Sequence, residues 1–176
     1  MELPFLSDED FFENCPPQTL CSVCGSNEIR PFMLVGDKYY WTCNVCKARI
    51  LSCKHWLSKE EEFKYYQTHE NISSDPAYQK FAAQLALPIL DKLIPNSSGL
   101  DFGCGPDSAL SAILRQHGHN MTVYDPFFFP DKNSLKKNYD FILCSEAAEH
   151  FHQPAKEFKK LSLIHISEPT RRSDIA

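Results

Sequence analysis

The sequence lacks three features that would each indicate a particular class of protein. No run approaches the 18 or more apolar residues of a membrane-spanning helix. The acidic start, residues 1–10, has no basic segment leading into an apolar one, as a secretory signal would. The net charge of −5 gives no general nucleic-acid signal. We therefore expect a cytoplasmic protein without a membrane partner, and 176 residues suit one medium domain or a small domain with a partial one.

What the sequence does contain is a glycine turn between two predicted strands. Residues 100–107 read Leu-Asp-Phe-Gly-Cys-Gly-Pro-Asp, and Tyr124-Asp125-Pro126 follows. The pattern predicts a strand, a tight turn, a helix, a second strand and a carboxylate at the end of that strand. In a doubly wound sheet this is where a nucleoside-containing cofactor binds. Asp125 follows Gly105 by 20 residues, the spacing at which an acidic side chain reaches ribose hydroxyls.

The turn differs from a dinucleotide-binding turn in ways that select its ligand. A pyrophosphate needs free N–H groups at a helix N-terminus, but Pro106 has no N–H and Asp107 repels anions. Ser108 replaces the third glycine of the fingerprint, and Asp101 adds a carboxylate before the turn. Such a site suits a positively charged adenosine compound without phosphate, such as S-adenosylmethionine. A nicotinamide cofactor is the less favoured alternative.

These motifs resemble the class I S-adenosylmethionine-dependent methyltransferases, together with the segment Tyr-Asp-Phe-Ile-Leu-Cys-Ser-Glu-Ala-Ala-Glu-His at residues 139–150. The resemblance covers roughly residues 58–160. It implies an α/β fold with a partial doubly wound, Rossmann-like sheet, and methyl transfer to an unidentified acceptor. It also implies that Gly103 and Gly105 lie under the methionine part of the cofactor and that Asp125 binds its ribose. The full expected cofactor-binding set is Asp101, Gly103, Cys104, Gly105, Asp125, Pro126 and Glu146.

Two departures from the family pattern are visible. Asp107 stands where many members have a small residue. Only thirteen residues separate Asp125 from Tyr139, too few for the usual third strand and its helix, so we expect an abbreviated sheet edge. The segment 126–130, Pro-Phe-Phe-Phe-Pro, is either an apolar wall beside the adenine or a loop folded over the core.

The turn after the strand at 139–144 is where substrate chemistry is expected. Glu146 and His150 are four residues apart and share a face if this turn is helical. Glu149 and His150 are the catalytic candidates, because either could orient the acceptor or accept a proton. In the alternative, Glu146 caps the turn and His150 packs over the pocket without a chemical role.

Four of the eight cysteines have the spacing of a metal site. Cys21, Cys24, Cys43 and Cys46 form C-x2-C-x18-C-x2-C, and the intervening residues 31–42 read as two strands around a Gly36-Asp37 turn. Such a hairpin brings the four thiolates around one Zn²⁺ in a closed, structural site. The pattern resembles a zinc ribbon, a small β-hairpin domain, at residues 21–57.

The ribbon has a local net charge of +3 over residues 21–54, with Tyr39, Tyr40 and Trp41 interleaved. This permits RNA contact by stacking and phosphate attraction, although aromatics that fill a thin core are the favoured alternative. A second function therefore stays open: a zinc ribbon that binds RNA or protein beside a non-catalytic Rossmann-like domain.

The remaining segments complete the organisation. Residues 1–20 are expected to form a loose lead-in. Ser58-Lys-Glu-Glu61 predicts a capped helix to about His69, and Asp75-Pro76 opens a helix to about Leu93. Tyr66, His69 and Tyr78 on these helices either face the cofactor or pack without contacting it.

The last sixteen residues are expected not to be natural protein sequence. Residues 161–171, Leu-Ser-Leu-Ile-His-Ile-Ser-Glu-Pro-Thr-Arg, match the translation of a library-adapter DNA, and 172–176 would be index sequence. We therefore expect the natural sequence to depart near Lys160, with residues 58–160 the front part of a longer methyltransferase domain.

Overall fold

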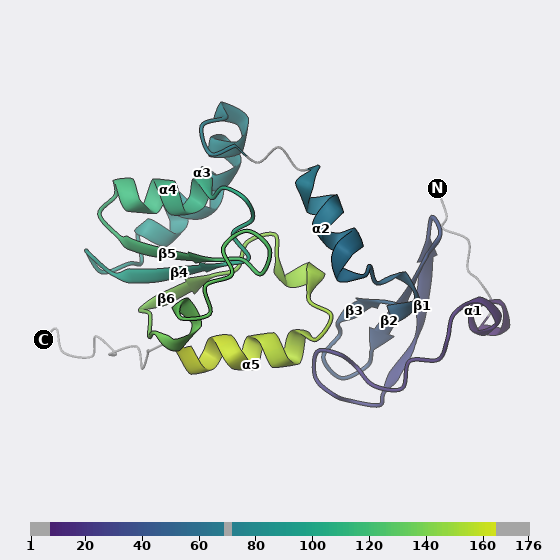
Figure 1. Cartoon of the computed structure of the whole chain (residues 1–176). Coiled ribbons are helices and arrows are strands. Elements are labelled where there is room, and N and C mark those ends of the chain that lie inside the picture. Colours follow the sequence, from purple (N-terminus) through teal and green to yellow (C-terminus); the bar gives the residue numbers. More distant parts are fainter. Residues whose placement is uncertain (1–7, 69–71, 165–176) are drawn as a thin grey trace, which may run out of the picture. The chain divides into compact units, whose positions relative to one another are not determined.

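The computed structural model describes residues 8–68 and 72–164 (Figure 1). The chain divides into two compact units. The first comprises the residues up to Glu62 together with Phe151–Phe158, and the second comprises Phe63–His150 and the residues from Lys159 onward. Among the described residues, no helix has the length and apolar character needed to cross a membrane.

The first unit contains an antiparallel sheet in the order β1-β2-β3. Its strands are β1 (Ile29–Val35), β2 (Lys38–Cys43) and β3 (Arg49–Leu51), followed by the short 3-10 helix η1 (Cys53–His55). β1 and β2 are joined at the predicted Gly36-Asp37 turn, where Gly36 has a φ of 60°. This confirms the predicted hairpin. β3 was not predicted, because three residues are too few to show strand periodicity.

Helix α1 (Asp8–Asn14) contributes to the core of this sheet. Phe11 is 2% exposed and meets Trp41 edge-to-face, with ring centroids 5.2 Å apart. Cys15 is also buried, and its Sγ donates to Ser52 Oγ at 3.1 Å. Burying one Phe side chain contributes about 1.5–3 kcal/mol. The expectation of a loose lead-in is therefore wrong for residues 8–15, because this segment forms helix α1 and places Phe11 and Cys15 in the core.

The second unit contains a parallel sheet in the order β5-β4-β6. Its strands are β4 (Ser98–Phe102), β5 (Asn120–Tyr124) and β6 (Phe141–Leu143). β4 is the central strand, and β6, which lies within the strand predicted at 139–144, pairs beside it. Helices α3 (Pro76–Leu90) and α4 (Ala109–Gln116) lie on the same side of this sheet (Figure 1). Their apolar faces and the sheet enclose a core of Ala82, Ala86, Ala109, Leu110, Leu114, Met121, Phe141 and Leu143.

The predicted helix boundaries follow local capping signals. The Glu61 N–H donates to Ser58 Oγ and the Ser58 N–H donates to Glu61 Oε2 at 2.8 Å, which is the reciprocal pattern of a capping box at the start of α2 (Lys59–Gln67). Asp75 caps α3, and Ser108 caps α4. α3 ends at Leu90 rather than at the predicted Leu93.

Between β5 and β6 the chain makes a short connection without a further strand in the described residues 126–140. An isolated bridge pairs Asp125 with Phe129, and the 3-10 helix η2 spans Ser134–Lys136. The Tyr139 hydroxyl donates to the Ser134 carbonyl at 2.8 Å and holds the connection closed. The predicted abbreviated edge is confirmed for this stretch.

Helix α5 (Pro154–Ile164) was not predicted. It begins with Pro154, which suits a first helical turn because its missing N–H is not needed there. The Tyr139 N–H donates to the Ile164 carbonyl at 3.0 Å. Of the terminal segment 161–176, residues 161–164 form the last turn of this helix, and the rest lies outside the described residues.

Candidate functional site

The glycine turn between β4 and α4 is bent back over the end of β5. Gly103 and Gly105 have φ values of 76° and 68°, a region that L side chains rarely adopt. The Gly103 N–H donates to the Tyr124 carbonyl at 2.8 Å. A Cβ on Gly103 would lie 2.5 Å from Ala147 Cβ, whereas a Cβ on Gly105 would meet nothing within 4 Å. The turn is therefore tightly packed at Gly103 and open at Gly105.

Asp125 connects this turn to the turn that follows β5. Its side chain is buried, and Oδ2 accepts a hydrogen bond from the Gly105 N–H at 3.0 Å. Oδ1 accepts from the N–H groups of Phe127 at 2.8 Å and Phe128 at 3.1 Å. A carboxylate offers about four acceptor positions. Three are used by backbone groups, which leaves Asp125 able to accept one more hydrogen bond.

Asp101 holds the first turn of α4 against the middle of the sheet. It is 3% exposed, and Oδ2 accepts hydrogen bonds from Ser108 Oγ at 2.5 Å and Ser111 Oγ at 2.9 Å. Burial raises the pKa of this carboxyl, and the two hydroxyls and Arg115 oppose that rise. Asp101 was predicted to bind the cofactor; in the structure, its Oδ2 accepts from the hydroxyls of Ser108, which caps α4, and of Ser111, which lies in α4.

Cys104 is the buried side chain inside the turn. Burial raises the pKa of its thiol to about 12, and the nearby carboxylates of Asp101 and Asp125 add to the rise. A thiol with this pKa stays protonated at neutral pH and is a poor nucleophile. Cys104 therefore contributes volume to the site rather than reactivity.

The turn after β6 lies beside the glycine turn through the close approach of Ala147 to Gly103. It contains the 3-10 helix η3 (Ala148–His150), on which the exposed Glu149 and His150 lie. Glu146 precedes η3 and has a φ of 51°. The condition under which Glu146 and His150 would share a helical face is not met, since η3 begins at Ala148 and Glu146 has a left-handed backbone.

The carboxyl ends of the three parallel strands thus bring most of the predicted residues to one edge of the sheet. Gly103, Cys104 and Gly105 follow β4, Asp125 and the exposed Pro126 follow β5, and the catalytic candidates Glu149 and His150 follow β6. This is the edge at which open α/β sheets bind ligands.

An aromatic cluster lies next to Asp125 in sequence. We define it as Phe63, Tyr66, Phe127, Phe128 and His150. The Phe127 ring lies 5.5 Å from Phe63 and 5.8 Å from Tyr66, between centroids, and Tyr66 meets His150 edge-to-face at 5.5 Å. Phe127 and Phe128 therefore pack against aromatic side chains of α2. His69, the third aromatic candidate on the helices, lies outside the described residues.

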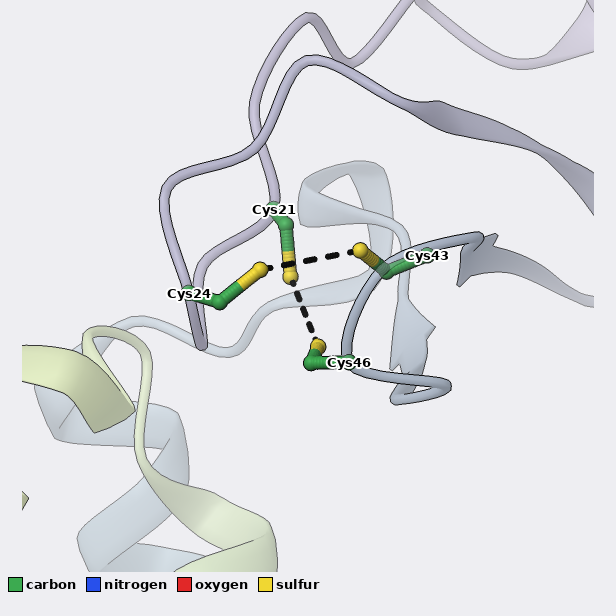
Figure 2. A group of neighbouring side chains, drawn as sticks. All are labelled: Cys21, Cys24, Cys43 and Cys46. Atoms are coloured by element: carbon green, nitrogen blue, oxygen red, sulfur yellow. Dashed lines mark hydrogen bonds between the residues drawn. The ribbon is translucent and has the colours of Figure 1, made fainter.

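The four predicted metal ligands converge in the first unit, and Figure 2 shows their sulfurs directed at a common centre. The Sγ atoms all lie within 4.8 Å of one another, and the pairs Cys21–Cys46 and Cys24–Cys43 are each 3.6 Å apart. Four Zn–S bonds of about 2.3 Å in a tetrahedron require sulfur separations of roughly 3.8 Å. The group could hold a metal ion, and its sulfurs are too far apart for disulfides.

Two similar backbone turns shape this cysteine group. The Gly25 N–H donates to the Cys21 carbonyl at 2.9 Å, and the Lys47 N–H donates to the Cys43 carbonyl at 3.1 Å. Gly25 and Lys47 occupy equivalent positions, with φ values of 75° and 63°. The second turn thus adopts a left-handed backbone without glycine, at a cost of about 1–2 kcal/mol.

The closeness of the sulfurs also shifts their acidity. The backbone N–H of Cys46 lowers the pKa of the Cys43 thiol to about 7. The backbone N–H of Ala48 favours the Cys46 thiolate, but desolvation and the three neighbouring cysteines raise the pKa of Cys46 to about 12. A bound cation would allow all four to ionise.

The aromatics of the ribbon bear on the RNA prediction. Trp41 is 2% exposed, and the Tyr39 ring lies 5.0 Å from that of Phe11. Lys54 lies over Tyr39, with its Nζ 5.1 Å from the ring centre. This packing favours the alternative in which the aromatics fill the core of the ribbon.

Comparison with protein-family models relates the second unit to known proteins. A family model described as a methyltransferase domain matches residues 75–165, which is just over half of the chain. The match includes the glycine turn, Asp125 and η3. No curated protein matches the sequence.

Proposed function

Because the chain belongs to the methyltransferase-domain family, we propose that it is a class I methyltransferase that uses S-adenosylmethionine. The observation that carries this proposal is the link between the Gly105 N–H and the Asp125 carboxylate. It holds the glycine turn after β4 against the end of β5, at the sheet edge where nucleoside ligands bind. When bound, S-adenosylmethionine supplies a methyl group activated by the neighbouring sulfonium.

The residues of the turn suit this ligand in two respects. Asp125 retains an acceptor position that a ribose hydroxyl would fill, since three of about four positions are used by backbone N–H groups. The open side of Gly105 allows a ligand to approach the backbone, because no atom lies within 4 Å of the place of a Cβ. Cys104, with its protonated thiol, offers the sulfonium no competing nucleophile.

Positioning is the main contribution of the protein to methyl transfer, since in-line attack needs a fixed donor and a fixed acceptor. Orientation of this kind lowers barriers by about 7–11 kcal/mol in the most favourable intramolecular cases. Glu149 and His150 lie exposed on η3, next to the turn that contains Gly103. We assign them to the acceptor side, where either could orient the acceptor or take its proton. The acceptor class is left open.

For the ribbon we propose one Zn²⁺ held by Cys21, Cys24, Cys43 and Cys46. Their sulfur separations match a tetrahedral Zn²⁺ site. Four protein ligands leave no position for substrate, so the role is structural. The metal would stabilise the two cysteine turns, whose Cys21 and Cys43 share a core with Phe11 of α1 and Trp41 of the sheet.

The proposal is tested by calorimetric titration of the full chain with S-adenosylhomocysteine, the demethylated product, and with NAD⁺ in parallel. We expect saturable binding of the first and none of the second, because Pro106 and Asp107 offer no anion site. If NAD⁺ binds and S-adenosylhomocysteine does not, the result favours a nicotinamide enzyme. If neither titration gives a heat of binding, the cofactor proposal is contradicted.

A further inference from the structure

Asp107 is the residue of the glycine turn that departs from the family pattern, and the structure gives it two partners from one distant segment. The Ser73 N–H donates to Asp107 Oδ2 at 2.7 Å. The Tyr78 hydroxyl lies 3.4 Å from the Asp107 carbonyl and donates to it. Ser73 precedes α3 and Tyr78 lies in its first turn. Both bonds therefore join the start of α3 to the last residue of the glycine turn.

The segment that supplies these donors is itself well ordered by hydrogen bonds. The Asp75 N–H donates to the Ile72 carbonyl at 2.9 Å, and Asp75 Oδ1 accepts from the Ala77 N–H at 3.0 Å. Gln79 Nε2 donates to the Ser73 carbonyl at 2.9 Å. The Ser73 N–H is thus held in place by a capped helix start and is a fixed partner for the carboxylate.

The chemistry of Tyr78 strengthens the connection. Burial raises the pKa of its hydroxyl, and the charges of Asp101 and Asp107 raise it further. The hydroxyl therefore stays protonated and keeps its donor. The Tyr78 ring also packs against the core of the second unit, and this packing fixes the position of the hydroxyl that donates to the Asp107 carbonyl.

The turn itself needs such support. Its two glycines have more conformational freedom than other residues, and fixing them costs entropy. A site that is ordered before the ligand arrives does not pay this cost on binding. The side chain of Asp125 anchors the turn at Gly105, and Asp107 anchors its far end.

We propose that Asp107 is a positioning residue of the cofactor site: its carboxylate ties the glycine turn to the segment Ile72–Tyr78, and this tie preorganises the turn for the adenosyl ligand. The proposal rests on the proposed function, because it assigns the ligand to the same turn. The presence of an acidic residue here is explained by the Ser73 N–H, which a small side chain could not reach.

The test compares Asp107→Ala with Asp107→Asn in the full chain. Both remove the charge, but the asparagine keeps an oxygen that can accept from the Ser73 N–H. Two readouts are measured: hydrogen exchange of the Ser73 amide without ligand, and the dissociation constant for S-adenosylhomocysteine. Asp91→Asn is the control, since it removes an exposed carboxylate at the other end of α3.

We expect Asp107→Ala to expose the Ser73 amide to exchange and to weaken binding by roughly tenfold, as for the loss of one hydrogen bond to a charged group. Asp107→Asn should recover part of both effects, because its neutral oxygen still accepts from the Ser73 N–H, and Asp91→Asn should match the wild type. Equal weakening by Ala and Asn would overturn the proposal in favour of a direct charge effect. Unchanged binding by Asp107→Ala would overturn it as well.

The outcome for the wild type separates this inference from the proposed function. If the wild type binds S-adenosylhomocysteine and Asp107→Ala binds equally well, the positioning role fails alone. If the wild type does not bind the compound at all, the proposed cofactor fails and the positioning role fails with it.

Discussion

The backbone N–H of Gly105 and the carboxylate of Asp125 meet at 3.0 Å, although the two residues are 20 positions apart and follow different strands. The parallel pairing of β4 with β5 makes this possible, because Phe102 lies opposite Tyr124 at the ends of the strands. Both residues are therefore held by the register of the sheet. A bound adenosyl ligand would find them in place.

Removal of the metal should unfold the ribbon. A small sheet with one main aromatic core has little other stabilisation, so metal binding supplies much of its folding free energy. We expect one Zn²⁺ per chain by elemental analysis. Trp41 is buried in this core, so chelation should abolish its near-ultraviolet circular-dichroism signal.

Single substitutions provide the control for the metal site. Cys43→Ser should lose the metal, because it removes one of the four converging sulfurs. Cys53→Ser should retain it, since Cys53 is exposed and lies outside the group. Equal metal content in the two variants would contradict the assignment.

Gly103→Ala should destabilise the second unit and weaken ligand binding. The added Cβ would lie 2.5 Å from Ala147 Cβ, and the left-handed backbone is strained for alanine. Together these effects should cost about 2–4 kcal/mol in the free energy of unfolding, measured by denaturant titration.

The double variant Gly103→Ala with Ala147→Gly separates the two costs. Removing the methyl group of Ala147 relieves the clash but leaves the backbone strain, so we expect partial recovery of stability. If stability does not recover, the clash between the added Cβ and Ala147 is not a cause of the destabilisation.

Asp101 should make the stability of the second unit depend on pH. Its folded-state pKa is raised above the usual 3.8, chiefly by burial. The folded state therefore holds this proton more tightly than the unfolded state, and stability is lost as the pH rises from about 4 through the folded-state pKa. For each pH unit by which the folded-state pKa lies above the unfolded-state pKa, the free energy of unfolding falls by about 1.4 kcal/mol across this pH range.

Asp101→Asn tests this dependence directly. The amide oxygen can still accept from Ser108 and Ser111, but it carries no charge to bury. We expect the unfolding free energy of the variant, minus that of the wild type, to increase as the pH is raised above about 4. A difference that is constant with pH would show that Asp101 does not titrate in this range.

Features encoded by neighbouring residues were predictable from the sequence. Ser58 with Glu61 and Asp75 with Pro76 are local signals, and each starts a helix where predicted. The cysteine spacing indicated the convergence of four thiols, because a short hairpin leaves few other arrangements. In each case the determining residues lie close together in the chain or are joined by one short turn.

Features that depend on distant partners were not predictable in this way. α1 is stabilised by Phe11 against Trp41, thirty residues later, and no periodicity marks so short a segment. Asp101 was expected at the ligand, but its serine partners lie at the cap and in the first turn of α4 and become apparent only from the packing of helix on strand. The tie between Asp107 and Ser73 likewise spans 34 residues.

The most direct test of the account is the dissociation constant of the full chain for S-adenosylhomocysteine, compared between the wild type and Asp125→Ala. We expect saturable binding at one site and a loss of at least tenfold in the variant, because the alanine removes both the ribose acceptor and the anchor of Gly105. Equal affinity in the two proteins, or no binding by the wild type, would contradict the claim that Asp125 and the glycine turn form an adenosyl site.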